Sequence, residues 1–349
     1  MKKGLILLGL LASTVYAQDV SKYTPGLTEE GVVYYLPKTE IKVDVIAEKI
    51  LYTPGELCQY ANRYLKISDV SDKAEVHWEV KSIRVYAVGV ADVNNAYTIK
   101  LKDKSAASQV ELSKEGVIKA INTVAPEEPV NIIAPTPKAA KSIDPRSFLT
   151  EDILNSTSSA KMAELVAKEI YNIRDSRNSL TRGQADYMPK DGAALKIMLD
   201  NLSTQEKAMT ELFTGVTTKE TKEFNFTVAP EENITDKVLF RMSSKLGVVN
   251  ADDLSGNPVY ISIKDLEVIP PADIEAKKKK KLEGVVYNVP GKALVSIFSS
   301  TKKFYNEELP ITQFGEKEVL IDNLFNKKVN TRVIFNPYTG GISKIDKDM

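Results

Sequence analysis

Seven charged side chains in the middle of the chain could do chemistry if the fold brings them together. They are three arginines and four carboxylates: Arg174, Arg177, Arg182, Glu169, Asp186, Asp191 and Glu206. Guanidinium groups match the geometry of carboxylate and phosphate groups, so one hypothesis is a site for an anionic ligand. The other hypothesis is an ion-pair network that fixes a loop and the register of two helices. We favour the structural network, because a charge on a packed helix face needs a partner.

Carboxylates alone could also support catalysis, in a hydrolase that acts on glycans or peptides. Such an enzyme needs two carboxyl groups about 5–10 Å apart, one of them with a raised pKa. Glu169, Asp186 and Glu206 are the candidates, but the chain has 47 acidic side chains and no motif selects a pair. We therefore assign no catalytic residues and expect a protein that is not an enzyme.

His77 is the only histidine and Cys58 the only cysteine. One histidine excludes histidine-rich zinc sites, and a nucleophile with a histidine base would have to use His77. His77 lies in a strand-like segment beside Trp78, where we expect it to be partly buried. We expect Cys58 to be buried as a small apolar residue; a reactive thiol or a disulfide-linked dimer is the alternative. The sequence thus predicts no metal and no cofactor.

Two helices must position the seven charged residues. Between residues 160 and 177, Met162, Val166, Ile170 and Ile173 fall on one face, as in an amphipathic helix with Ser158 or Thr157 as its N-cap. A second helix is predicted from Gly192 to Phe213, with Asp191 before it and Gly215 after it. The connection is rich in turn-forming residues, which predicts an antiparallel helical hairpin.

The first 17 residues have the pattern of a secretory signal peptide. Two lysines precede an apolar run from Leu5 to Leu11, and cleavage is expected after about Ala17. No cysteine stands near this point, so a lipoprotein is not expected, and no apolar run is long enough to cross a membrane. We expect an exported protein of the periplasm or cell envelope. Acidic and basic side chains number 47 each, so we predict no nucleic-acid partner.

Short strand-like segments surround the hairpin and predict an α+β fold, in which two β-rich modules flank it. We expect Asp92–Asn95 to form a hairpin turn between two strands. The ranges that we expect are 1–17 (signal peptide), 20–124 (N-terminal β-rich module), 125–147 (Pro/Ala-rich linker), 148–215 (helical hairpin), 216–270 (β-rich connecting segment), 271–283 (Lys-rich loop) and 284–349 (C-terminal β-rich module).

The two β-rich modules begin alike. GVVYYLP from Gly31 matches GVVYNVP from Gly284. Gln59 and Gln313 then lie at similar distances from these glycines, and each module ends on a strand with an arginine, Arg84 or Arg332. The pattern indicates an internal duplication.

Four segments carry a resemblance to a known family: VVYYLPKTE, AELVAKEIYNIRDSRNSLTRGQADYMPKDG, DDLSGNPVYI and NPYTGGISKI. They resemble exported Bacteroidetes proteins of unknown function, domain-of-unknown-function family 4831. The resemblance implies an envelope or secreted location in a Gram-negative anaerobe and supplies no site residues. Together, these observations predict a non-enzymatic binding or assembly module whose partner is an envelope protein or a small ligand.

Overall fold

A computed structural model describes residues 27–28, 31–99, 109–126, 144–189, 191–269, 284–325 and 330–348. These residues form three antiparallel sheets and a central pair of long helices, which confirms a mixed α and β fold. The predicted signal peptide, residues 127–143 of the predicted linker and all of the predicted Lys-rich loop lie outside the described residues.

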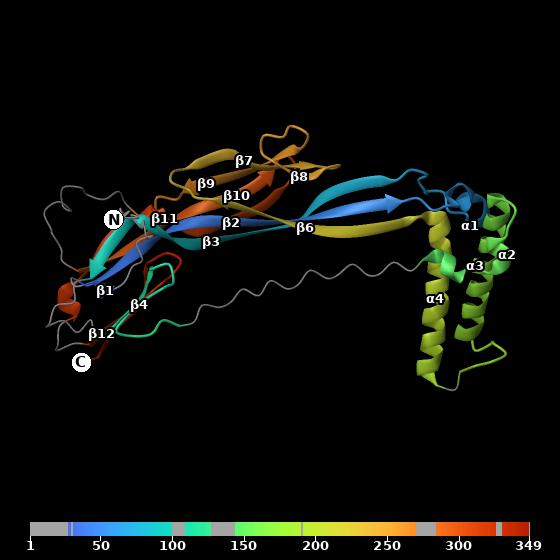
Figure 1. Ribbon diagram of the computed structural model, residues 1–349, viewed down its shortest axis with the longest axis horizontal. Coiled ribbons are helices and arrows are strands. Elements are labelled where there is room, and N and C mark those ends of the chain that lie inside the picture. The colour runs from blue at the N-terminus through green and yellow to red at the C-terminus, as the bar shows by residue number, and fades with distance from the viewer. Residues whose placement is uncertain are drawn as a thin grey trace, which may run out of the picture.

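A long ribbon of strands runs through the molecule (Figure 1). Its central strand β2 (Gly31–Thr53) lies between β3 (Glu75–Ile99) and β6 (Val216–Val228), and β1 (Leu27–Thr28) pairs with its first residues. Ile41, Val43 and Val45 alternate with polar residues and are fully buried. Period-two alternation of this kind gives the ribbon one apolar face and one polar face.

A five-stranded sheet packs on the apolar face of the ribbon. Its order is β11 (Lys303–Ile321), β10 (Gly284–Ser299), β9 (Asn257–Asp265), β7 (Ile234–Ser243) and β8 (Gly247–Val249). Phe240, Ile261 and Val295 from this sheet are fully buried in one cluster with Ile41 and Val43. This shared apolar core holds the two sheets together.

The third sheet joins the two ends of the chain. Its order is β13 (Ile342–Asp348), β12 (Asn330–Phe335), β5 (Ile118–Ile121) and β4 (Val110–Leu112), and η3 (Asp322–Phe325) precedes β12. β12 pairs with β5, so strands from residues 20–124 and 284–349 share one sheet. Fully buried Tyr34 adds a further link, because its hydroxyl donates to the Val286 carbonyl at 2.8 Å. Burial raises the pKa of Tyr34.

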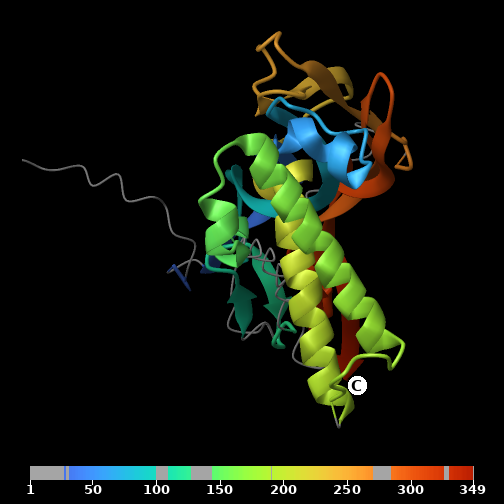
Figure 2. The same ribbon diagram turned by 90° about the vertical axis from the view of Figure 1, so that its right-hand side faces the viewer.

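The helices other than η3 form a head at one end of the long axis, away from the β body made by the strands listed above (Figure 1). The head comprises η1 (Cys58–Tyr60), α1 (Ala61–Leu65), η2 (Pro145–Phe148), α2 (Glu151–Leu154), α3 (Ser159–Thr181) and α4 (Gly192–Thr214). The predicted antiparallel hairpin α3–α4 is confirmed, and Figure 2 shows the two helices side by side. The Ser158 and Asp191 side chains cap them, accepting from the amides of Lys161 and Ala194.

A narrow neck of three strands (residues 48–53, 75–79 and 216–222) connects the head to the β body, and most of its side chains are exposed or half-exposed. Glu48 is its anchor, accepting from Lys219 at 2.8 Å and from Lys81 at 3.3 Å. The hydrogen bond from Lys219 lowers the pKa of Glu48. A lowered pKa means that the folded state favours the ionised carboxylate over the protonated one. The stability that ionised Glu48 contributes is therefore lost as the pH falls and the carboxylate is protonated.

Tyr52 fastens the head to the neck. Its hydroxyl lies 2.9 Å from the Ser71 carbonyl and 3.0 Å from the Thr214 carbonyl at the end of α4. The Leu57 amide donates to the Leu212 carbonyl at 2.8 Å. Of the helices that the structure describes, none combines the length and apolarity needed to cross a membrane.

Gly89 in β3 allows a close approach that any side chain would block. A Cβ atom there would lie 2.4 Å from the Tyr338 carbonyl oxygen, in the turn between β12 and β13. Because that atom is backbone, Gly89→Ala should lower the free energy of unfolding by about 2 kcal/mol. Gly192→Ala is the control, since nothing lies within 4 Å of its Cβ position. It should raise stability by about 0.5–1 kcal/mol. Urea denaturation measures both, and equal effects would contradict the packing described.

Candidate functional site

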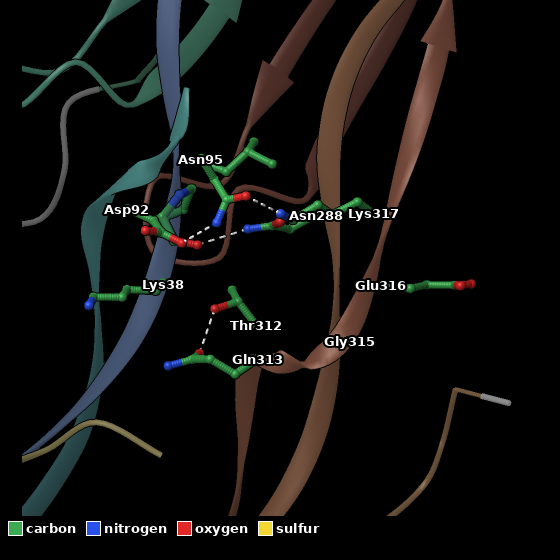
Figure 3. Close-up of a pocket in the computed structure, with 11 residues that line it drawn as sticks. Lys38, Asp92, Asn95, Asn288, Thr312, Gln313, Gly315, Glu316 and Lys317 are labelled. Atoms are coloured by element: carbon green, nitrogen blue, oxygen red, sulfur yellow. Dashed lines mark hydrogen bonds between the residues drawn. The ribbon is translucent and has the colours of Figure 1, made fainter. Parts of the chain in front are cut away.

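A polar pocket of about 280 Å³ lies where the ribbon meets the β10–β11 hairpin (Figure 3). We call it the bulge pocket. Its lining residues come from β2, β3, β10 and β11 and are Leu36, Pro37, Lys38, Asp92, Asn95, Asn288, Thr312, Gln313, Gly315, Glu316 and Lys317. The pocket therefore brings together segments from both ends of the chain.

Two matched β-bulges build the pocket. In the β2–β3 pair, Tyr35 pairs with Ala96 and Pro37 with Ala91, so that a single residue faces residues 92–95. In the β10–β11 pair, Val289 pairs with Glu316 and Gly291 with Ile311, so that Pro290 faces residues 312–315. Each bulge lies beside the proline of the repeated GVVY segment. Extra residues in one strand locally turn side chains away from the regular sheet, here into the pocket.

The hairpin turn predicted at Asp92–Asn95 is wrong, because these residues lie inside the continuous strand β3. The Asp92 carboxylate accepts from the Asn94 amide at 3.2 Å and from the Asn95 side chain at 2.5 Å. Local side-chain to backbone hydrogen bonds of this kind stabilise turns and bulges alike. Such a cluster of Asp and Asn predicts a turn, although here it forms a bulge.

Gln313 completes the hydrogen bonding of β2. Its side-chain oxygen accepts from the Thr39 amide at 3.0 Å, and its side-chain nitrogen donates to the Thr39 carbonyl at 2.8 Å. Thr312 adds two contacts: its hydroxyl accepts from the Thr39 amide at 2.9 Å, and its own amide donates to the Thr39 hydroxyl at 3.0 Å. Thr39 is 1% exposed, so these groups replace the water that its backbone would otherwise bind.

Asn288 makes the equivalent link at Pro37. Its side-chain nitrogen donates to the carbonyls of Pro37 and Thr339, both at 2.9 Å. Gly340, with φ of +70°, packs so closely that a Cβ atom there would lie 2.6 Å from the Pro37 ring. The Tyr35 amide donates to the Gly116 carbonyl at 2.8 Å. Residues from four separate segments thus enclose this part of β2.

Three of the remaining polar side chains, those of Lys317, Asn95 and Asp92, are linked by hydrogen bonds. Lys317 donates to the Asn95 side chain at 2.8 Å, and its ammonium lies 5.6 Å from the centre of the Tyr97 ring. The Lys38 and Glu316 side chains point away from these three side chains (Figure 3). Lys38 and Lys317 balance Asp92 and Glu316 in charge. Asn288, Thr312 and Gln313 use their side chains to bond backbone groups of β2. These residues of the pocket therefore connect β2 to the β10–β11 hairpin.

Three of the seven charged residues singled out in the sequence come together. Glu206 accepts from Arg174 Nε at 2.7 Å and from an Arg177 guanidinium nitrogen at 2.5 Å. The Glu206 side chain is 14% exposed, and those of Arg174 and Arg177 are 34% and 36% exposed. The cluster joins α3 to α4 midway along the hairpin and borders a shallow cavity of about 410 Å³.

The other four residues lie elsewhere. Glu169 accepts from the side chain of Asn172 on the same helix at 3.1 Å, and Asp191 caps α4. Arg182 and Asp186 are exposed in and beside the hairpin loop. The structure thus divides the seven residues among a three-membered cluster, a helix cap, two exposed positions and the half-buried Glu169. A helical wheel places charges on a face but does not show where the following loop runs.

His77 and Cys58 differ from expectation in their burial. His77 lies in β3 as predicted, but it is exposed instead of partly buried. Cys58 is half-buried in η1 rather than fully buried. Within the described ranges, no three His, Cys, Asp or Glu residues are placed to hold a metal ion.

Sequence reasoning missed Thr39, Asn288 and Gln313, because each is an ordinary polar residue outside any catalytic motif. The repeated GVVY segment was the usable signal, since Asn288 lies inside its second copy. Further along, the copies diverge: Gln59 lies in η1 whereas Gln313 lies in β11, and Arg84 lies in β3 whereas Arg332 lies in β12.

One family model matches the chain, over residues 30–343, and its description is Domain of unknown function (DUF4831). No curated protein and no solved structure matches the chain significantly.

Replacing Gln313 with glutamate should give a pH-dependent loss of stability. When the pH exceeds the ordinary pKa of a glutamate carboxyl group, near 4.3, the new side chain is ionised. One of its oxygens would then face the Thr39 carbonyl oxygen, and two acceptors in contact cost about 1–3 kcal/mol. The folded state should hold this carboxyl protonated, so its folded-state pKa lies above the unfolded value. The loss relative to wild type should therefore shrink as the pH falls from 7 to 4. Urea midpoints at both pH values measure it, with Gln184→Glu in the exposed loop as the control. A loss independent of pH would contradict this pairing.

Arg177→Ala tests the cluster on the helices. Because the Arg177 side chain is partly exposed, we expect a cost of about 1 kcal/mol instead of the 3–5 kcal/mol typical of a fully buried pair. Arg182→Ala, at an exposed position, should leave the free energy of unfolding unchanged. The assignment fails if both variants show the same melting temperature as wild type.

Proposed function

The chain belongs to the domain-of-unknown-function family DUF4831, and on that premise we propose that it is an exported Bacteroidetes protein of the cell envelope and works as a non-enzymatic binding or assembly module. The basic and apolar pattern of residues 1–17 supports export. The separation of a helical head from a β body by a narrow neck supports a role in contacts with a partner.

The outer half of the helical hairpin carries the proposal. All four buried residues of α4 lie near its C-terminal end: Ala208, Met209, Leu212 and Phe213. Nearer its N-terminus, Leu195 and Leu199 remain half-exposed, and Ile197 is 62% exposed. In the adjoining loop, Tyr187 is 73% exposed. Apolar side chains gathered at the free end of a projecting element are typical of a contact surface.

We also infer that the β2–β3 and β10–β11 hairpins are copies of one ancestral unit. Both begin with GVVY, both place the first strand between two neighbouring strands, and both carry a bulge on the second strand beside the same proline. The divergence further along limits the copied unit to the hairpin. A duplicated hairpin supports assembly, because two like surfaces packed face to face build a rigid base for the head.

The hydrolase alternative finds less support at its candidate residues. Glu206 and Glu211 line the same cavity, but Glu206 faces two guanidinium groups and Glu211 lies 3.9 Å from the Lys207 ammonium. A general acid needs surroundings that disfavour its charged form, whereas cations border both of these carboxylates. Glu169 and Asp186 lie outside this cavity.

Site-specific photocrosslinking in intact cells tests the proposed role. A photoreactive amino acid at position 197 should yield one dominant crosslinked species in the envelope. The same amino acid at position 254 is the control, because Leu254 is also strongly exposed, at 81%, but belongs to the β body. Absence of a specific product from position 197, or the same products from both positions, would contradict a partner-binding head.

A further inference from the structure

A third cavity, of about 370 Å³, lies where the neck joins the β body. We call it the Trp78 groove. β3 forms one wall, the edges of β7 and β9 form another, and the turn between β10 and β11 closes the third side. Its volume falls within the range of about 300–1,000 Å³ typical of small-molecule sites, whereas the bulge pocket is smaller.

The floor and the rim of the groove differ in chemistry. Buried or half-buried apolar residues form the floor: Trp78, Val80, Met242, Val259 and Phe304. Exposed polar residues form most of the rim: Glu79, Ser244, Asn257, Ser300, Thr301 and Lys302. An apolar floor beneath a few convergent polar groups is the usual composition of a ligand site.

The walls are held in place before any ligand arrives. The Trp78 amide donates to the Ser244 carbonyl at 2.8 Å, which ties β3 to the turn between β7 and β8. Gly247 lies so close to the indole ring that a Cβ atom there would be 2.9 Å from it. In the β10–β11 turn, the Ser299 hydroxyl accepts from the Lys302 amide at 3.1 Å. Pre-formed walls reduce the entropy lost on binding.

The cations near the groove favour a ligand that carries hydrogen-bond acceptors. Lys302 lines the groove, and the ammonium groups of Lys49 and Lys222 lie 6.0 and 5.7 Å from the centre of the Trp78 ring. The alternation of side chains along β3 places Glu79 on the opposite face of the strand from Trp78. The Lys302 ammonium lies 5.2 Å from the centre of the Phe304 ring, so it stands at the border between rim and floor. A ligand that fits must present an apolar face downward and hydrogen-bonding groups along its edge.

We propose that the Trp78 groove binds a saccharide. A pyranose ring has an apolar face of C–H groups, which packs on aromatic and aliphatic side chains, and an edge of hydroxyl groups that both donate and accept. The rim supplies both kinds of partner, with Lys302 and Asn257 as donors and the Ser300 hydroxyl, which both donates and accepts. In the bulge pocket, by contrast, Asn288, Thr312 and Gln313 already serve the backbone.

The test uses the full chain on a glycan array that covers the common pyranose stereochemistries. Each glycan that is retained is then titrated while the emission of Trp78 is followed, because Trp78 is the only tryptophan in the chain. We expect at least one glycan to bind and to shift or quench that emission. An array without bound glycans overturns the proposal, and so does a bound glycan that leaves the emission unchanged, because it would lie elsewhere.

A matched pair of variants places the glycan in the groove. Lys302→Met should weaken binding about tenfold by removing a charged hydrogen-bond donor. Lys303→Met removes the same charge at the next position, which does not line the groove, and should bind as wild type. Melting temperatures confirm that both variants are folded. Equal affinity of the two variants would overturn the assignment, whatever the outcome of crosslinking at the head.

Discussion

The hydrogen bonding of one edge of β2 sets the arrangement of the sheets. That edge pairs with β1 at the start of the strand and with β6 only from Ile41 onward. In the buried stretch between them, each unsatisfied backbone group would cost about 1–3 kcal/mol. The carbonyl of Gly116 and the side-chain amides of Asn288 and Gln313 satisfy these groups. Because the three partners belong to different segments, satisfying a few backbone atoms fixes how the third sheet and the β10–β11 hairpin lie against the ribbon.

Local signals in the sequence predicted the local structure well. The apolar stripe of α3, the caps Ser158 and Asp191, and the antiparallel hairpin all depend on residues a few positions apart. Prediction failed where partners are distant. The hydrogen bonds between Gln313 and Thr39 span 274 positions, and no periodicity in a single sequence reveals such a pair. The bulge at Asp92 was missed for a different reason, because its side-chain chemistry is the same as that of a turn.

Two of the segments that carry the family resemblance meet in space. VVYYLPKTE contributes Pro37 and Thr39, and NPYTGGISKI contributes Thr339 and Gly340, which pack against Pro37 and Asn288. The two segments approach each other closely here, and a side chain at Gly340 would collide with the Pro37 ring. Few residue types therefore fit at these positions. The resemblance therefore rests partly on residues that shape the fold at this junction.

The closure of an N-terminal strand by C-terminal residues also governs the order in which the chain can fold. β2 is made early, yet the residues that contact Tyr34 and Thr39 follow 252 to 274 positions later. Until they emerge, the edge of β2 near Thr39 lacks these native partners, and an open strand edge invites aggregation. Contacts so distant in sequence are slow to form. The helical head is built largely from one continuous segment, residues 145–214. It can therefore fold before the last residues of the chain complete the β body.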